Sequence, residues 1–144
     1  MEKVHIAVNG SLMRGLALNG NLTVVGAEFV REAKTSDKYR MWSIDDSYPA
    51  MILDADGGAS IELEIWELST EALMEVLRSE PPGLTMGKVY LYNGEWVFGI
   101  LGEPFICKGM QEITKWGGFR NYLLEMGLTT KLEQAHSSNK KTGS

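Results

Sequence analysis

The sequence predicts an α+β domain: a small curled mixed β-sheet or barrel with helices packed outside it. Two observations lead to this class. Most of the chain consists of short segments in which apolar and polar residues alternate, which is typical of half-buried strands, whereas only two segments, both after residue 68, show helical spacing. The 144 residues, 44% of them hydrophobic, suffice for one domain with a core and are few for two.

Strands account for most of the predicted elements. The first is expected over residues 3–8, and an irregular stretch rich in turn residues follows the tetrapeptide 9–12. Residues 26–34 fit either a helix or, through the alternation over 28–33, a strand. We expect a strand because the turn at 35–38 leads into a further alternating segment. Tryptophans in the strands are expected in the core. The other expected strands cover residues 39–44, 48–52, 60–66, 87–92 and 96–101, with Asn93 and Gly94 as a hairpin turn between the last two.

Two helices are predicted from the signals at their ends. The first has Ser69 or Thr70 as its N-cap and stops at a pair of prolines. The second runs over residues 118–126, where apolar residues recur at helical spacing and a glycine follows. Residues 1–128 are therefore expected to form one domain, and the polar residues 129–144 a disordered tail.

Composition and charge exclude several classes of function. The net charge is −5 and the basic residues form no cluster apart from Lys140 and Lys141, so we expect no nucleic-acid surface. No apolar run approaches the roughly 20 residues that span a bilayer, and the N-terminus lacks a signal-peptide core, so we expect a cytoplasmic protein without a membrane segment. The single cysteine and the two histidines are scattered, which predicts no disulfide, no metal site and no cofactor.

The turn after the first strand is the first candidate binding site. Gly10 allows the backbone to turn sharply and lets another molecule approach its N–H groups. Successive N–H groups of Gly10, Ser11 and Leu12, next to Asn9, would form a small concavity that attracts a carboxylate or another anion. The alternative is an ordinary turn that leaves a strand.

Several short motifs, in this order and spacing, resemble the gamma-glutamyl cyclotransferase-like fold. They are Gly-Ser-Leu at residues 10–12, Tyr-Pro-Ala at 48–50, Ile-Trp-Glu-Leu at 65–68, and a glutamate at the end of the next helix, Glu80. Within that fold the chain is similar to the C-terminal domain of allophanate hydrolase over nearly everything up to Leu123. The matching segments are residues 15–19, 22–23, 26–27, 39–40, 61–68, 82–84, 87, 113–114 and 117–123.

The resemblance to allophanate hydrolase implies an accessory or catalytic domain of urea breakdown. In that enzyme a separate amidase domain removes ammonia first, and the C-terminal domain is thought to help decompose the remaining N-carboxycarbamate to carbon dioxide and ammonia. This chain contains no amidase stretch. It also lacks the histidine that the family usually carries around the position of Ser11 and Leu12, which weighs against the same decarboxylation chemistry.

Glu80 is the candidate catalytic residue. A carboxylate at the C-terminal end of a helix faces the negative end of the helix dipole, so helix stability does not explain it, and Pro81 restricts its backbone to an extended conformation. In the cyclotransferase relatives the matching glutamate is the general acid or base, whereas the allophanate hydrolase domain often has an apolar residue there. The alternative is a solvated glutamate in a loop.

Three further side chains complete the predicted site. Arg40 and Arg120 are candidate carboxylate clamps because a guanidinium group offers a planar fork of donors, although surface ion pairs are the alternative role. Tyr48 is a candidate to close the pocket with its ring and hydroxyl, and the alternative is an aromatic of the core or of a strand edge. Glu62 and Glu64 alternate with apolar residues and are expected on the solvent face or at the rim of the barrel.

Three functions are open on this reading. The leading hypothesis is a free-standing allophanate hydrolase C-terminal-like domain with a pocket for a small carboxylate or carbamoyl compound, acting in the breakdown of a urea-derived or similar carboxylated amide. The first alternative is a gamma-glutamyl cyclotransferase that releases 5-oxoproline. The second is a non-catalytic partner of a separate amidase, or an oligomerisation module that forms a homo-oligomer.

Overall fold

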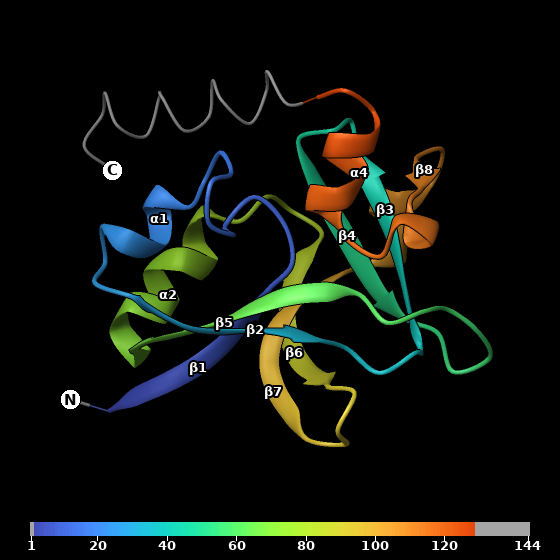
Figure 1. Ribbon diagram of the computed structural model, residues 1–144. Coiled ribbons are helices and arrows are strands. Elements are labelled where there is room, and N and C mark those ends of the chain that lie inside the picture. Colours follow the sequence, from blue (N-terminus) through green and yellow to red (C-terminus); the bar gives the residue numbers. More distant parts are fainter. Residues whose placement is uncertain (1, 129–144) are drawn as a thin grey trace.

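The computed structural model describes residues 2–128 of the chain and confirms the α+β class (Figure 1). In this part of the chain the strands form a five-stranded sheet in the order β2-β5-β1-β7-β6 and a three-stranded sheet in the order β4-β3-β8. The strands are β1 (Lys3–Val8), β2 (Glu28–Lys34), β3 (Tyr39–Ile44), β4 (Tyr48–Leu53), β5 (Glu62–Ser69), β6 (Leu84–Tyr90), β7 (Trp96–Gly102) and β8 (Gln111–Glu112).

The five-stranded sheet is mixed and strongly curled. Strand β1 runs parallel to β7 and antiparallel to β5, and the other neighbouring strands pair antiparallel. An isolated bridge between Thr35 and Leu91, just beyond β2 and β6, brings the two outer strands together at one end. Among the described residues this contact does not extend into a ladder. The expected curled sheet is therefore present, and the alternative of a closed barrel is not.

Both predicted helices are confirmed. Helix α2 (Thr70–Ser79) follows β5 directly, and the hydroxyl of Ser69 caps it by accepting a hydrogen bond from the N–H of Ala72 at 3.1 Å. Helix α4 (Phe119–Glu125) lies next to β3 and β4, at the opposite end of the molecule from α2 (Figure 1). Three elements are too short to show helical periodicity in the sequence: α1 (Gly20–Thr23), α3 (Pro104–Cys107) and the 3-10 helix η1 (Thr114–Trp116).

Strand β1 lies in the middle of the five-stranded sheet. Its pairing with β5 runs from Lys3 opposite Ser69 to Val8 opposite Glu64, and its other edge pairs with β7. The second half of β1 is buried, as expected for an apolar central strand. Hydrogen bonds on both edges therefore hold the end of β1, and the turn that follows it, inside the fold.

The prediction that Trp96 belongs to the core is wrong. Its side chain is 47% exposed, packs edge to face against Phe98 with ring centroids 5.2 Å apart, and lies 4.7 Å from the ammonium group of Lys88. Trp66, in the central part of the same sheet, is buried. Alternation places Trp96 and Phe98 on one face of β7, but it does not reveal that this end of the face is left open by the other residues that the structure describes.

Replacing Ser69 by alanine tests the start of α2. We expect the free energy of unfolding to fall by about 1 kcal/mol, because the N–H of Ala72 loses its acceptor. Urea denaturation of the native protein and the variant measures the difference. Ser69→Asp retains an acceptor at the N-cap and should restore the stability. Equal stability of Ser69→Ala and the native protein would contradict the assignment of the cap.

Two further expectations from the sequence concern membrane-spanning helices and the C-terminal residues. Within residues 2–128 no helix has both the length and the apolar character needed to cross a membrane. The expected tail, residues 129–144, lies outside the described residues, so the domain boundary at residue 128 stays a prediction.

Candidate functional site

The turn after β1 is buried and fastened by its own polar side chains. The side-chain amide of Asn9 donates a hydrogen bond to the carbonyl oxygen of Ile100 at 2.9 Å. The hydroxyl of Ser11 donates to the carbonyl oxygen of Ser47 at 2.7 Å, and the carbonyl of Ser11 in turn accepts from the N–H of Leu18 at 2.8 Å. These bonds tie the turn to β7, to the β3–β4 hairpin and to the following loop.

The backbone N–H groups of this turn are not used by the fold. Within residues 2–128, the N–H groups of Gly10, Ser11 and Leu12 donate to no carbonyl or side-chain acceptor, and the carbonyl of Gly10 accepts from the N–H of Met13 at 2.9 Å. Backbone donors in a buried position normally have a partner. Successive N–H groups that point the same way are a common binding site for anions.

Gly10 is required by a close contact rather than by an unusual backbone angle. A Cβ atom at this position would collide with the ring of Pro49, at Cδ and, 2.7 Å away, at Cγ. The glycine therefore lets the start of β4 lie directly against the turn. The sequence-based argument for a glycine at this site was its freedom to turn, and the structure adds this steric reason.

The β3–β4 hairpin sets the opposite wall of the site. Asp45 and Asp46 both have a positive φ, 52° and 58°, as a type I′ hairpin turn requires. The carboxylate of Asp46 accepts hydrogen bonds from the hydroxyls of Ser43 at 2.6 Å and Tyr122 at 2.7 Å, which holds this turn in place. Tyr48, at the start of β4, lines the same cavity as the glycine turn.

These elements enclose a small cavity, which we call the turn cavity. Its volume is about 30 Å³, and apolar side chains from β1, β6 and β7 complete its walls. The predicted site residues that line it are Asn9, Gly10, Ser11, Leu12, Tyr48 and Glu80. The fold therefore places the end of α2 against the turn that follows β1, although the two are far apart in the sequence.

Glu80 differs from an ordinary surface glutamate. It is the C-cap of α2, its backbone is extended (ψ 141°) as expected before a proline, and its N–H donates to the carbonyl of Leu77 at 3.2 Å. Among residues 2–128 no group hydrogen-bonds to or pairs with its carboxyl group. Burial disfavours the ionised form and raises the pKa of Glu80 to about 7.

The two candidate carboxylate clamps lie elsewhere. Arg40 forms ion pairs with Asp54 at 2.7 Å and with Glu112 at 3.0 Å on the three-stranded sheet. Arg120 donates to the carbonyl oxygen of Arg14 at 2.6 Å and does not line the turn cavity. The structure thus brings six of the eight predicted site residues together and leaves these two arginines out.

The expected exposure of Glu64 is wrong. Its side chain is 1% exposed, because the loop after the glycine turn and helix α4 cover this face of β5. One carboxylate oxygen accepts from the backbone N–H of Arg14 at 3.0 Å and the indole N–H of Trp66 at 3.1 Å. The other accepts from the guanidinium groups of Arg14 at 3.1 Å and Arg120 at 3.3 Å.

These contacts decide the charge of Glu64. Burial alone would raise the pKa of Glu64, but the hydrogen bonds from Arg14 and Trp66, together with the charge of Arg120, outweigh it and hold the pKa below its usual range. Glu64 is therefore ionised, and it fixes the loop that continues the glycine turn. No local sequence signal marks this role, since Glu62 and Glu64 belong to the same alternating pattern.

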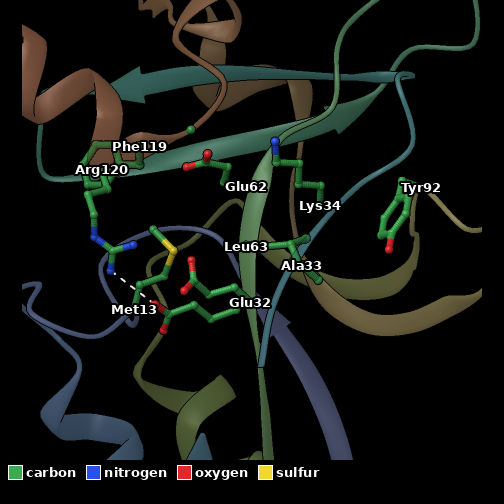
Figure 2. Close-up of a pocket in the computed structure, with 11 residues that line it drawn as sticks. Met13, Glu32, Ala33, Lys34, Glu62, Leu63, Tyr92, Phe119 and Arg120 are labelled. Atoms are coloured by element: carbon green, nitrogen blue, oxygen red, sulfur yellow. Dashed lines mark hydrogen bonds and ion pairs between the residues drawn. The ribbon is translucent and has the colours of Figure 1, made fainter. Parts of the chain in front are cut away.

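A second and larger cavity lies next to Glu64 (Figure 2). We call it the charged cavity; its volume is about 300 Å³. Its polar lining consists of Glu32, Lys34, Glu62, Glu64, Tyr92 and Arg120. Arg120, a candidate ligand contact from the sequence, lines this cavity and not the turn cavity.

Comparison with known proteins identifies the family of this chain. The family model of the allophanate hydrolase C-terminal domain matches residues 4–124. The chain belongs to this family. The urea amidolyase of Lachancea kluyveri is 32% identical over 129 residues, which cover 85% of this chain. The chain spans only about 7% of the length of that relative.

Solved structures agree with this family. A uropathogenic E. coli-specific protein has 45% sequence identity and a TM-score of 0.83, with 85% of this chain and 96% of that chain covered. The allophanate hydrolase of Kluyveromyces lactis has 29% identity and a TM-score of 0.82, with 88% of this chain and 22% of that chain covered. An AIG2-like protein of Mus musculus, at 17% identity and a TM-score of 0.59 over 79% of this chain and 88% of that chain, shares the gamma-glutamyl cyclotransferase-like fold alone.

Replacing Gly10 by alanine tests the close approach of Pro49. We expect the free energy of unfolding to fall by about 1–3 kcal/mol, because the added methyl group forces the turn and β4 apart. Chemical denaturation measures the loss. Gly15→Ala is not a suitable control, since Gly15 has a positive φ of 79°. Gly87→Ala, whose Cβ would meet only the end of the Leu101 side chain at 3.1 Å, should be tolerated better.

Proposed function

We propose that the turn cavity of this allophanate hydrolase C-terminal domain binds a small carboxylate or carbamoyl compound, and that Glu80 transfers a proton within it. One observation supports the proposal. The carboxyl group of Glu80 and the N–H groups of Gly10, Ser11 and Leu12 line the same cavity, and none of them has a hydrogen-bond partner among residues 2–128. The N–H groups would hold the anionic oxygens of the compound, and Glu80 would reach its nitrogen.

The size of the turn cavity favours a small compound. At roughly 10–15 Å³ for each water molecule, its volume of about 30 Å³ admits only about two of them. A carbamate or a short carboxylate is close to this size. A γ-glutamyl dipeptide is several times larger and would require the walls formed by Tyr48 and Leu18 to move apart. The cavity therefore supports the leading hypothesis over a gamma-glutamyl cyclotransferase.

The raised pKa of Glu80 suits a general acid or base. With a pKa of about 7, both the neutral and the ionised form are populated near neutral pH. For a carbamate, neutral Glu80 would donate its proton to the nitrogen while the C–N bond breaks and its electron pair stays on the nitrogen. Carbon dioxide and the amine would leave, and solvent would then protonate the Glu80 carboxylate again. We propose breakdown of a urea-derived or similar carboxylated amide on this basis.

Ligand binding and turnover in variants of Glu80 test the proposal. Acetate, carbamate, malonate, allophanate analogues and γ-glutamyl amino acids would be screened by thermal shift against the native protein, Glu80→Gln and Glu71→Gln. Glu71 is an exposed glutamate on the same helix and serves as the matched control. We expect a small carboxylate or carbamoyl compound to raise the melting temperature of all three proteins, and turnover to be lost in Glu80→Gln alone.

Two results would overturn the proposal. If none of the small compounds stabilises the protein, the turn cavity is not their binding site. If Glu80→Gln turns over a bound compound at the native rate, Glu80 has no role as acid or base. Release of 5-oxoproline from γ-glutamyl dipeptides would instead favour the cyclotransferase alternative.

Partnership with an amidase is a second candidate function. The domain accounts for 22% of the allophanate hydrolase chain and 8% of the urea amidolyase chain of Kluyveromyces lactis, so in both proteins it is part of a larger polypeptide. We propose that this chain associates with a separate amidase in a comparable way. Co-purification with an amidase from the source cells supports this candidate. Size-exclusion chromatography that finds the chain alone, with or without that amidase, argues against it.

A further inference from the structure

The charged cavity lies apart from the turn cavity and shares no lining residue with Glu80 or the glycine turn. From its volume and its charges we propose that it binds a small zwitterion: a compound with one carboxylate and one ammonium group, such as a free amino acid. Its volume of about 300 Å³ lies at the lower end of the range of small-molecule pockets, about 300–1,000 Å³.

The charges around this cavity balance one another. The three carboxylates of Glu32, Glu62 and Glu64 are matched by the cations of Lys34 and Arg120 in the lining and by Arg14 behind it. A simple anion would be repelled by the carboxylates of Glu32 and Glu62, and a simple cation would be repelled by the ammonium group of Lys34. A ligand that carries both charges can satisfy both signs at once, which is why we infer a zwitterion.

Some of these charged groups are already neutralised within the protein. Glu64 accepts four hydrogen bonds, from Arg14, Trp66 and Arg120, and has no capacity left for a ligand. Glu32 is paired with Arg14 at 3.5 Å. Glu64 therefore forms a fixed base for the cavity, and recognition of a ligand falls to other residues.

Two opposite charges in the lining remain available. One carboxylate oxygen of Glu62 accepts from the side-chain amide of Asn121 at 3.0 Å, and the other has no partner in the described chain. The ammonium group of Lys34 forms no ion pair or hydrogen bond within residues 2–128. In Figure 2 the Glu62 carboxylate lies between Arg120 on one side and Lys34 on the other. We assign the ligand's ammonium group to Glu62 and its carboxylate to Lys34.

Isothermal titration calorimetry with matched probes tests this assignment. The probes are the zwitterions glycine, β-alanine and 4-aminobutyrate, and the singly charged acetate and ethylammonium. The proteins are the native chain, Lys34→Met and Glu62→Gln, with Lys108→Met and Glu125→Gln as controls at exposed positions that do not line the cavity. Thermal melts of each variant serve as the control for correct folding.

We expect at least one zwitterion to bind to the native protein, and neither singly charged probe to bind measurably at the same concentration. Each cavity variant should weaken that binding at least about tenfold, because a charge-assisted contact is lost, whereas the control variants should leave it unchanged. Absence of binding by all three zwitterions overturns the proposal, as does equal binding by native protein and cavity variants. Glu80→Gln should not affect this binding, so failure here is distinct from failure of the proposed function.

Discussion

Replacing Glu64 by glutamine should lower the free energy of unfolding at pH 7 by about 2–4 kcal/mol. The side chain is 1% exposed, and both of its carboxylate oxygens accept hydrogen bonds. A neutral amide has only one accepting oxygen, so some of these donors would lose their acceptor. The loss should stay below that of a fully buried ion pair, because the side chains of Arg14 and Arg120 are 45% and 31% exposed and can turn towards water.

Glu32→Gln is the matched control for Glu64→Gln. Glu32 pairs with the same arginine at 3.5 Å, but its side chain is 76% exposed, so we expect a change of less than about 1 kcal/mol. Urea denaturation of the native protein and both variants measures the two losses. Similar losses in Glu64→Gln and Glu32→Gln would contradict the role of Glu64 as the buried anchor of this cluster.

The effect of Glu64 should also depend on pH. Since the folded protein lowers the pKa of this carboxyl group, its contribution is fully present above the pKa of the unfolded chain. It is lost as the pH falls through the lower pKa of the folded state. The stability difference between native protein and Glu64→Gln should therefore be full at pH 7 and shrink in acid. A difference that stays constant down to pH 3 would contradict the lowered pKa.

Replacing Glu80 by glutamine should have the opposite effect and stabilise the protein above neutral pH. Folding raises the pKa of Glu80 from 4.5 to about 7, so the unfolded chain ionises at a lower pH than the folded one. The native protein should therefore lose stability between pH 4.5 and 7, by roughly 3 kcal/mol in total, and change little from this cause above that window. Glu80→Gln removes this loss.

Denaturation of native protein and Glu80→Gln at pH 4 and pH 8 measures this effect. The two proteins should be similar in stability at pH 4, where Glu80 is mostly neutral in both states, and the variant should be more stable at pH 8. Glu71→Gln, an exposed substitution on the same helix, should show no comparable gain. If the Glu80 variant gains nothing at pH 8, its carboxyl group is solvated and the proposed proton transfer loses its physical basis.

Together the two glutamates show how one domain keeps carboxyl groups in different states. Glu64 is surrounded by donors and stays ionised. Glu80 lies in a mostly apolar cavity, has no partner among the described residues, and has a pKa of about 7. The two carboxyl groups line different cavities, so Glu80 alone has a pKa that suits proton transfer near neutral pH. Glu80 destabilises the fold when it is ionised, and a residue of that kind is expected where function requires it.

Much of the fold was predictable from local patterns. Alternation located the strands around β1 and β5, and the Ser69 cap with the proline pair located α2, because these signals depend on residues that are neighbours in the sequence. The turn at Gly10 was also visible, since a glycine follows a clear strand. The link between that turn and Glu80 came only from the resemblance to a known family.

The tertiary structure alone decided which charges are free. Alternation places Glu62 and Glu64 on one face of β5, but Glu64 is buried because a distant loop and α4 cover that part of the face. The pairing of β3 with β4 brings Arg40 next to Asp54, and the packing of α4 directs Arg120 to Arg14 and Glu64 rather than to the turn cavity. A period of two reports which side chains share a face, whereas what covers that face depends on contacts between segments far apart in the chain.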